Sequence, residues 1–368
     1  MTRPLRVGFV VQGEGRGHMT QALALARFLR DAGHEVTRAW VGTSPFRSVP
    51  DYFRDGIGAP LETFDAPVQV PDRKGLGASP IATLADVIKR APGFLRGARS
   101  LHEGTRDLDV VVNFLDIVAA LSRVLHGNRI PTVAVAHNYI FLHPDTHPLP
   151  GGGWAESSVL GWSRATAAHA RIRLALSFGA GRPLPSARLV VVPPLLRAGL
   201  DRITPRDDGF LLAYALNPGY GDLLAEWHRG RPDVRIRCYL DGGASALRTR
   251  PEAGFTTCDL SQDAFLTDLG RCRAFVGSAG FEAVCEAFHL GKPVLAVPTA
   301  GQYEQLLNAW DAERHGAAWV GGYEDLDHFW DTLPTPSDAS VAAFRAWVAA
   351  AADHHVKAVE WAARGEPF

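Results

Sequence analysis

The chain has 368 residues, of which 46% are hydrophobic and 21% charged, and its 38 basic and 39 acidic side chains give a formal net charge of −1. A single hydrophobic core rarely grows beyond about 250–300 residues, so we expect two domains. The balanced charge excludes the electrostatic footprint of a protein that binds a nucleic-acid polymer. The ample apolar content excludes a disordered chain.

The first half of the chain alternates between predicted strands and predicted helices. Four short runs rich in β-branched residues are typical of buried parallel strands: 6–11, 35–41, 109–112 and 132–136. Apolar residues at helical spacing predict one helix from Met19 to near Gly33 and another over 117–125. This alternation predicts a parallel sheet with helices on both faces.

Two segments of the first half do not follow this alternation. Residues 79–103 have helical spacing interrupted at Pro92-Gly93, which predicts a solvated pair of helices. Their basic side chains beside Ile and Leu leave open an acceptor-facing or membrane-facing surface. Residues 143–154, rich in Pro and Gly, are typical of a long functional loop.

The second half repeats the α/β pattern after a polar boundary at 201–208. Strand-like runs restart at 209–216, 234–240, 274–276 and 293–297. We therefore predict an N-terminal α/β domain over 1–195, a linker over 196–208, a second α/β domain over 209–335 and a C-terminal helical tail over 336–368.

The cysteines and the apolar segments indicate the compartment. Because the four cysteines have neither C-x-x-C spacing nor flanking histidines, we expect free thiols in a reducing compartment: Cys238, Cys258, Cys272 and Cys285. No segment approaches the roughly 18 apolar residues of a membrane span, and the first apolar run is too short for a signal peptide. The sequence thus predicts a cytoplasmic protein.

A glycine loop, Gly13, Gly15 and Gly17, precedes His18 between the first strand and the first helix. Glycines allow a tight turn, and the amide groups of a helix N-terminus attract anions. The loop is not a dinucleotide fingerprint, because His18 stands where a third glycine is needed, and no Gly-Lys-Ser/Thr follows. At the carboxyl end of a strand, His18 is a candidate general base; a cap or core role is the alternative.

Two further motifs follow strands in the second half. The turn 277–280 opens a helix that carries Glu282 and Glu286, whose carboxylates could accept from sugar or ribose hydroxyls. A solvated helix face would also explain both glutamates, and for Glu282 alone it is the preferred interpretation. Glu304-Gln305 opens a helix after the strand 293–297 and could bind several hydroxyls, although it is also an ordinary helix start.

Together these motifs resemble those of nucleotide-sugar-dependent glycosyltransferases of the GT-B fold, of the bacterial family 1 type and more distantly MurG-like. The segments 13–26, 278–298 and 304–309 carry the likeness, and D/E-Q-x-x-N-A after a G-K-P-V-L-x-V-P strand is the specific signature. The resemblance implies two Rossmann-like, doubly wound domains facing across a cleft. The acceptor would bind the first domain and the nucleotide sugar the second, with the helical tail packing back on the first.

The resemblance also implies roles for individual residues. His18 would activate the acceptor hydroxyl, Glu286 would accept from the ribose, and Glu304 with Gln305 would hold the donor sugar. The turn 277–280 would receive the donor diphosphate. The implied donor-binding residues are Gly277, Ser278, Ala279, Gly280, Phe281, Glu282, Glu286, Glu304, Gln305 and Asn308.

One position departs from the family pattern. Related enzymes often carry an aspartate that orients the histidine, and here Asn113 takes that place, with Asp116 three residues on. Asn113 could hold the ring but could not stabilise an imidazolium as a carboxylate does. Either Asp116 takes the role or His18 works without a charged partner; a helix cap is the competing interpretation of Asp116.

The implied reaction is a metal-independent, inverting transfer from a UDP- or TDP-sugar to a hydroxyl of a natural-product or lipid-like small molecule. Helix N-terminal amides would meet the charge of the leaving diphosphate, so we expect no cofactor beyond the donor. The D-x-D of Asp107 and Asp109 precedes a strand, which favours a connection over a metal site. The alternatives are a sugar-nucleotide 2-epimerase and a catalytically silent nucleotide-sugar-binding subunit. We expect a monomer or homodimer.

Overall fold

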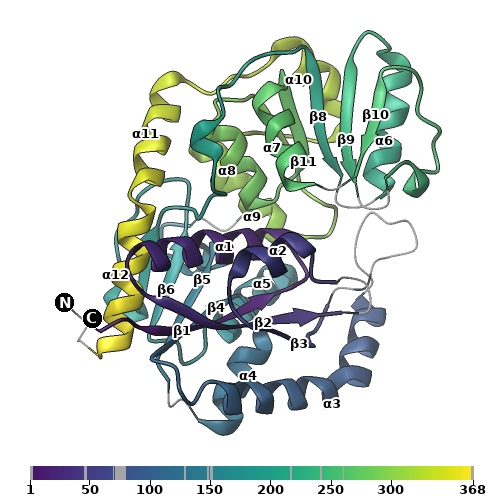
Figure 1. Ribbon diagram of the computed structural model, residues 1–368. Helices are drawn as coiled ribbons and strands as arrows, with labels where there is room; N and C mark the ends of the chain where they lie inside the picture. The colour runs from purple at the N-terminus through teal and green to yellow at the C-terminus, as the bar shows by residue number, and fades with distance from the viewer. Residues whose placement is uncertain are drawn as a thin grey trace. The chain divides into compact units, whose positions relative to one another are not determined.

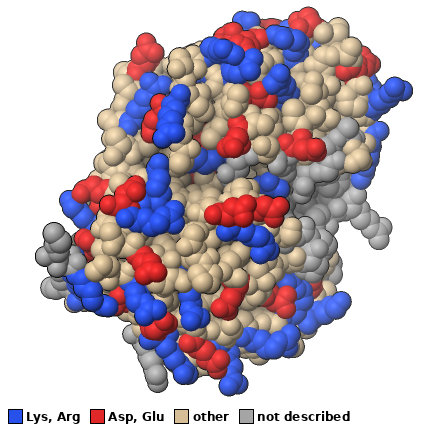
Figure 2. Space-filling view, in the orientation of Figure 1, with Lys and Arg blue, Asp and Glu red and all other residues tan. Residues whose placement is uncertain are grey.

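The structure is a computed structural model that describes residues 3–44, 48–68, 70, 80–127, 130–146, 149, 152–215, 218–240, 243–259 and 261–365. Contacts divide the chain into two compact units (Figure 1). One unit contains Met1–Val70, Pro80–Arg197 and Trp347–Phe368, and the other contains Ala198–Ala346. On the face shown in Figure 2, acidic and basic side chains are interspersed, as the near-zero net charge predicts.

The first unit has a parallel seven-stranded sheet in the order β3-β2-β1-β4-β5-β6-β7. Its strands are β1 (Arg6–Gln12), β2 (Glu35–Thr43), β3 (Leu61–Asp65), β4 (Val110–Phe114), β5 (Thr132–Ala136), β6 (Ile172–Leu176) and β7 (Leu189–Val192). Its helices are α1 (Arg16–Asp31), α2 (Asp51–Ile57), α3 (Pro80–Gly104), α4 (Ile117–His126), α5 (Gly153–Thr166) and α12 (Ala351–Arg364). Helices α3 and α4 cover one face of the sheet, and α1 and α12 cover the other (Figure 1).

The second unit has a parallel six-stranded sheet in the order β10-β9-β8-β11-β12-β13. Its strands are β8 (Phe210–Ala215), β9 (Arg235–Leu240), β10 (Phe255–Cys258), β11 (Ala274–Ser278), β12 (Val294–Val297) and β13 (Trp319–Val320). Its helices are α6 (Pro218–Gly230), α7 (Gln262–Arg271), α8 (Phe281–His289), α9 (Tyr303–Arg314) and α10 (Leu326–Thr332); α11 (Asp338–Ala349) begins in this unit and ends in the first.

Both sheets have the doubly wound topology that the sequence predicts. The strand order reverses between β1 and β4 in one sheet and between β8 and β11 in the other. Such a reversal opens a crevice at the carboxyl ends of the strands, where ligands of open α/β sheets bind. Every residue of β4 and of β5 is buried, because helices cover both faces.

Helix α3 differs from its prediction. The expected interruption at Pro92-Gly93 is wrong, because α3 runs unbroken from Pro80 to Gly104. Pro92 cannot donate to the carbonyl of Ile88, but both residues are exposed, so water can reach that carbonyl. Gly93 is needed for packing, since a Cβ there would lie 2.1 Å from Asp65 Oδ2.

The C-terminal helix α12 packs within the first unit. His355 is fully buried, and its Nε2 lies 3.0 Å from the carbonyl oxygen of Pro193. Glu360 accepts from His34 Nε2 at 3.0 Å, and Trp347 donates to the Ser177 carbonyl oxygen at 3.0 Å. The chain therefore returns to the first unit from residue 347.

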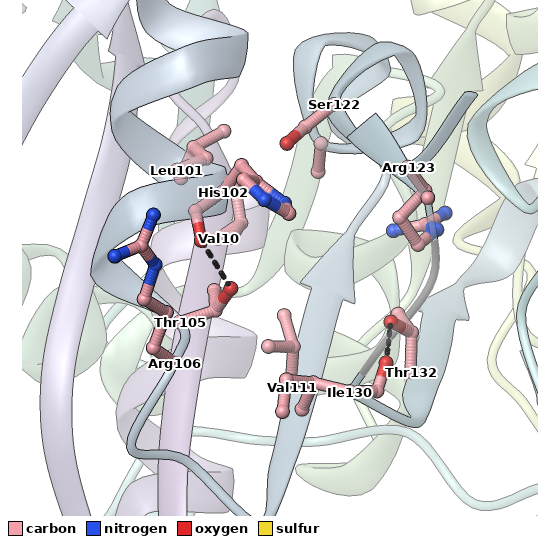
Figure 3. A pocket seen from close by; sticks show the side chains of 12 residues that line it. Val10, Leu101, His102, Thr105, Arg106, Val111, Ser122, Arg123, Ile130 and Thr132 are labelled. Carbon is pink, nitrogen blue, oxygen red and sulfur yellow. Dashed lines mark hydrogen bonds between the residues drawn. The ribbon is translucent and has the colours of Figure 1, made fainter. Parts of the chain in front are cut away.

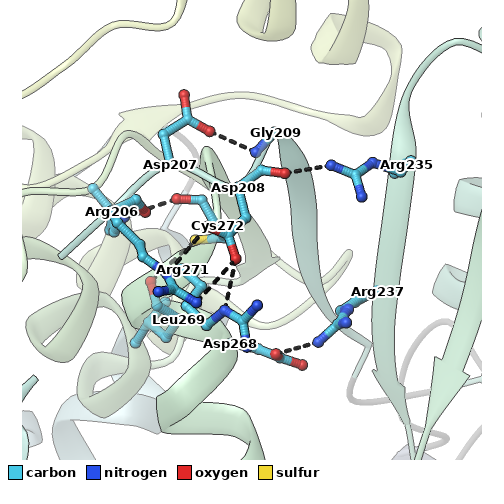
Figure 4. A network of polar contacts seen from close by, with 11 residues as sticks. Arg206, Asp207, Asp208, Gly209, Arg235, Arg237, Asp268, Leu269, Arg271 and Cys272 are labelled. Carbon is cyan, nitrogen blue, oxygen red and sulfur yellow. Dashed lines mark hydrogen bonds and ion pairs between the residues drawn. The ribbon is translucent and has the colours of Figure 1, made fainter. Parts of the chain in front are cut away.

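The segment before β8 is tied to the second unit by a polar network (Figure 4). The amide of Arg206 donates to the Gly270 carbonyl at 2.8 Å, and Arg271 forms an ion pair with Asp208 at 2.7 Å. Lys292, which is nearly buried, donates to the carbonyl oxygens of Arg206 and Cys272. The last residues of the predicted linker 196–208 are thus firmly attached. The four cysteines are free thiols, as expected.

Candidate active site

The glycine loop leaves the carboxyl end of β1 at the strand reversal. A Cβ on Gly13 would lie 2.0 Å from the carbonyl oxygen of Gly42, so only glycine lets the loop pass so close to the end of β2. Helix α1 begins at Arg16, and its N-cap, Gly15, makes no side-chain cap bond. The first amide groups of α1 therefore lack a side-chain cap at the edge where ligands bind.

His18 lies in the first turn of α1 and is half-buried. Its Nδ1 is 3.4 Å from Oε1 of Gln21, one turn further along the helix. Burial lowers the pKa of His18 to about 4, against the opposing effect of the Gln21 hydrogen bond. Because Gln21 Oε1 can only accept, Nδ1 carries the proton and Nε2 keeps its lone pair. His18 is therefore a neutral imidazole at neutral pH.

Asn113 and Asp116 are buried beside each other but do not hold His18. Asn113 Nδ2 donates to the carbonyl oxygens of Asp116 and Thr166, both at 3.0 Å, and its Oδ1 accepts from the Asp116 amide at 2.9 Å. Both donors of the Asn113 amide are thus engaged with backbone. The expectation that Asn113 orients the histidine is not met, because Gln21 is the polar partner of His18 among the described residues.

Asp116 takes the competing role that the sequence offered, as the N-cap of α4. Its Oδ1 accepts from the Ala119 amide at 2.8 Å. Burial raises the pKa of Asp116 to about 6, although the backbone amides oppose this. Its Oδ2 approaches Gly42, the residue that Gly13 also contacts, so the carboxylate lies beside the glycine loop without contacting His18.

In the second unit, the turn after β11 leads into the N-terminus of α8. The Gly280 amide donates to the Ser278 carbonyl at 2.6 Å, and Gly280 is the N-cap of α8 without a side-chain cap bond. Ser278 and Gly280 are partly exposed. A helix N-terminus whose first amides have no side-chain cap carries partial positive charge, so the turn suits a phosphate group.

The glutamates of α8 are not a solvated face, so that alternative is wrong. Glu282 is 8% exposed and Glu286 is fully buried. Burial, together with the carboxylates of Glu282, Glu286 and Asp311, raises the pKa of the Cys285 thiol far above its usual value. The two glutamates therefore lie in an acidic, buried region between α8 and α9. A role toward ribose stays a prediction.

The first residues of α9 are joined to both neighbouring turns. Gln305 is engaged within the protein, because its Oε1 accepts from the Thr299 amide at 2.8 Å and its Nε2 donates to Gln302 at 2.9 Å. Asn308 Nδ2 donates to the Ala279 carbonyl oxygen at 2.9 Å, which ties α9 to the turn 277–280. Glu304 is the partly exposed member of the predicted pair.

Two residues near the site were missed by sequence reasoning. Gln21 could have been found, because i and i+3 lie on one helix face. Thr299 carries no sequence signal. Its buried Oγ1 has no hydrogen-bond partner in the part of the chain that the structure describes, and neither has Oδ1 of Asn308.

Two cavities lie away from these motifs. A cavity of about 230 Å³ lies between α3, α4 and the sheet, next to Thr105 and Thr132 at the amino ends of the strands (Figure 3). Two polar side chains of its lining are engaged, since Ser122 donates to the Ala98 carbonyl and Arg123 to the Ala168 carbonyl. A second one, of about 360 Å³, lies between α3 and the edge strand β3.

The D-x-D pair also lies at the amino ends of the strands. Asp107 forms an ion pair with Arg6 at 2.6 Å, and Asp109 accepts from Arg3 and from the Arg6 amide. The interpretation as a helix-to-strand connection is confirmed. Within the described ranges, no group of three or more His, Cys, Asp or Glu residues has metal-site geometry. No described helix is long and apolar enough to cross a membrane.

Comparisons with known proteins place this geometry in a family. A family model described as glycosyl transferase family 1 matches residues 5–334. A search of curated protein sequences finds no match.

Solved structures match over nearly the whole chain. They include a glycosyltransferase of kitacinnamycin (19% identity, TM-score 0.62, all of both chains). A UDP-glucosyltransferase from Polygonum tinctorium matches with 16% identity and a TM-score of 0.62 over all of both chains. The glycosyltransferase VinC, in complex with dTDP, matches with 17% identity and a TM-score of 0.58 over 98% of this chain and 100% of that one. These likenesses confirm the predicted GT-B fold.

Proposed function

Because the chain belongs to glycosyl transferase family 1, we propose that it transfers a sugar from a UDP- or TDP-sugar to a hydroxyl of a small-molecule acceptor. The family makes it a glycosyltransferase. The pyrimidine nucleotide is supported by two of the similar structures, one described as a UDP-glucosyltransferase and one as a complex with dTDP. The turn 277–280 supports a site for the donor diphosphate in the second unit.

His18 acts as the general base of this reaction, and its geometry is the observation that carries the proposal. The acceptor oxygen attacks the anomeric carbon while its proton passes to Nε2 of His18. The bond from the anomeric carbon to the diphosphate oxygen breaks, and the nucleoside diphosphate leaves. A single displacement of this kind inverts the anomeric configuration.

Charge on the leaving diphosphate is met by the amides at the start of α8. These groups are fixed in place by the tight turn at Ser278 and Gly280, so no reorganisation is needed as charge develops. The amides of this helix N-terminus thereby stabilise the negative charge that a metal ion neutralises in other phosphate-binding sites. The acceptor binds the first unit, which carries His18.

The decisive experiment combines donor binding with the His18→Ala variant. A thermal-shift panel of UDP-, TDP- and GDP-sugars should show stabilisation by a pyrimidine nucleotide, about 2.7 kcal/mol at 100 times its Kd. The His18→Ala variant should keep this shift and lose turnover by roughly 10²- to 10⁴-fold. If no nucleotide stabilises the protein, the donor site is wrong; if His18→Ala keeps near-wild-type rates, the base is wrong.

Two further measurements distinguish the proposed transferase from the two alternatives, the 2-epimerase and the silent binding subunit. A 2-epimerase would interconvert sugar nucleotides without an acceptor, which NMR of the donor alone detects. A silent binding subunit would show the thermal shift but no turnover in the wild type with any acceptor tried.

A further inference from the structure

Helix α3 exposes three large aliphatic side chains on its outward face. Leu84, Ile88 and Leu95 are 62%, 67% and 51% exposed. At about 100° per residue, the three fall within about 40° of one another around the helix axis. Single exposed aliphatic residues are common on protein surfaces, but an aligned row over three turns is not.

This row is separate from the side of α3 that packs on the sheet. The inward side places Phe94, Ala98 and Leu101 in the core with Trp40 and Phe64 of the sheet. The outward row therefore adds nothing to the core of the unit. Packing within the unit does not explain why these three positions are aliphatic.

Positive charge flanks the row. Lys89 and Arg96 are exposed and form no ion pair within the described ranges. Between Pro80 and His102 the only acidic residue is Asp86, and it pairs with Arg90 at 3.4 Å. Arg99, one turn further on, is neutralised by Glu103 at 3.0 Å. The outward face thus carries two uncompensated cations beside its aliphatic row.

The first turns of α3 project beyond the carboxyl edge of the sheet. Arg90 donates to the carbonyl oxygens of Thr43 and Ala66, at the ends of β2 and β3. Gly93 packs beside Asp65 and Gly97 beside Phe64, so α3 runs back toward the amino edge and its residues before Arg90 lie further out. The glycine loop that carries His18 leaves the same edge of this sheet.

We propose that this face, which we call the α3 stripe (Leu84, Ile88 and Leu95 with Lys89 and Arg96), docks on the surface of an anionic lipid bilayer. Leu and Ile enter the boundary between headgroups and acyl chains, while Lys and Arg extend along it to the lipid phosphates. Each cation strengthens attraction to a negatively charged leaflet. The inference does not depend on the proposed function.

The charges argue against a second copy of the chain as the occupant. In a two-fold symmetric contact the same patch meets itself, so one interface would hold Lys89 and Arg96 from both copies. Juxtaposed like charges disfavour that contact, whereas an anionic lipid surface neutralises them.

Co-sedimentation with vesicles tests the proposal. The wild type should bind vesicles of phosphatidylcholine with 30% phosphatidylglycerol, and bind pure phosphatidylcholine vesicles far less. Lys89→Gln/Arg96→Gln should weaken binding to the anionic vesicles roughly 30-fold. Leu84→Gln/Ile88→Gln/Leu95→Gln should abolish it.

A matched control is Val124→Gln/Leu125→Gln on α4, which changes two comparably exposed aliphatic residues and should leave binding intact. All substituted side chains are exposed, and unchanged circular dichroism and an unchanged melting temperature show that the variants are folded. The proposal is overturned if the wild type does not bind anionic vesicles, or if the triple variant still binds them. A wild-type dimer that the triple variant loses would overturn it in favour of a second copy.

Discussion

Gln21 holds the imidazole of His18, with 3.4 Å between Gln21 Oε1 and His18 Nδ1. Gln21 is nearly buried, so its amide is fixed by the surrounding protein. It takes the orienting place of the carboxylate in a histidine–carboxylate pair, but it supplies no charge. In the proposed reaction the imidazolium would therefore form with no carboxylate of the described residues hydrogen-bonded to the ring.

This relationship predicts how Gln21 variants behave. Gln21→Ala should lower kcat roughly 10-fold, because the ring loses its orientation, and should leave the donor KM unchanged. Gln21→Glu should raise the pKa of His18, because a carboxylate favours the protonated ring. The measurement is the pH profile of kcat/KM. In the wild type the acid limb should fall near pH 4, and in Gln21→Glu it should move to higher pH. An unchanged kcat in Gln21→Ala would show that His18 is oriented by something else.

Asp116 predicts a pH-dependent stability. In the unfolded chain its carboxyl group ionises near pH 3.8, and in the folded chain near 6. Between these values the folded state holds more protons, so its contribution to stability falls as pH rises. The free energy of unfolding of Asp116→Asn, relative to wild type, should therefore rise by up to about 3 kcal/mol from pH 4 to pH 7. Asparagine keeps the N-cap. Urea titrations at several pH values measure it, and a pH-independent difference would contradict the raised pKa.

The buried His355 predicts the opposite pH dependence. Burial lowers its pKa from 6.5 to about 4, so below pH 6.5 the unfolded state binds the extra proton. Stability should fall by up to about 3 kcal/mol as pH drops from 6.5 to 4. His355→Gln should flatten this part of the curve, because a glutamine cannot be protonated. Denaturant titrations of both proteins test this, and identical slopes would rule it out.

Strands with continuous β-branched runs could be predicted from the sequence, and the edge strands β3 and β13 could not. β4 and β5 are buried on both faces, and their sequences are nearly continuous apolar runs. β3 and the two-residue β13 are edge strands, and only two of the five residues of β3, Leu61 and Phe64, are apolar. Their pairing depends on neighbours that a local pattern does not contain.

The candidate site shows the same division. Its motifs could be placed at strand ends from the sequence, because glycine turns and helix starts are local signals. The contacts of Asn113 could not be predicted from the sequence, since its partner Thr166 lies 53 positions away in the chain. The burial of Glu286 likewise depends on packing in the folded unit and not on its own helix.

Removal of divalent metal should leave activity unchanged. The proposed reaction meets the leaving-group charge with the amides of α8, so saturating EDTA should not reduce turnover. Initial rates with and without chelator, on extensively dialysed enzyme, measure it. A loss that Mg²⁺ restores would show that a metal ion takes part.

The hydrogen bond from Asn308 joins α9 to the turn 277–280, and we expect its loss to weaken donor binding. Its amide donates to the Ala279 carbonyl oxygen at 2.9 Å, and both residues are buried. Asn308→Ala leaves that buried carbonyl without its donor, which costs about 1–3 kcal/mol and frees the turn to shift. The donor KM should rise roughly 10-fold, with a smaller effect on kcat, because the lost interaction positions the bound donor.

Leu306→Ala on the same helix is the matched control for Asn308→Ala. Leu306 is 42% exposed, so its truncation should leave the donor KM unchanged. Steady-state kinetics with varied donor, together with the thermal shift that UDP or TDP produces in each variant, separate donor binding from general instability. Asn308→Ala with a wild-type donor KM and a wild-type shift would show that the tie between α9 and the turn has no part in holding the donor.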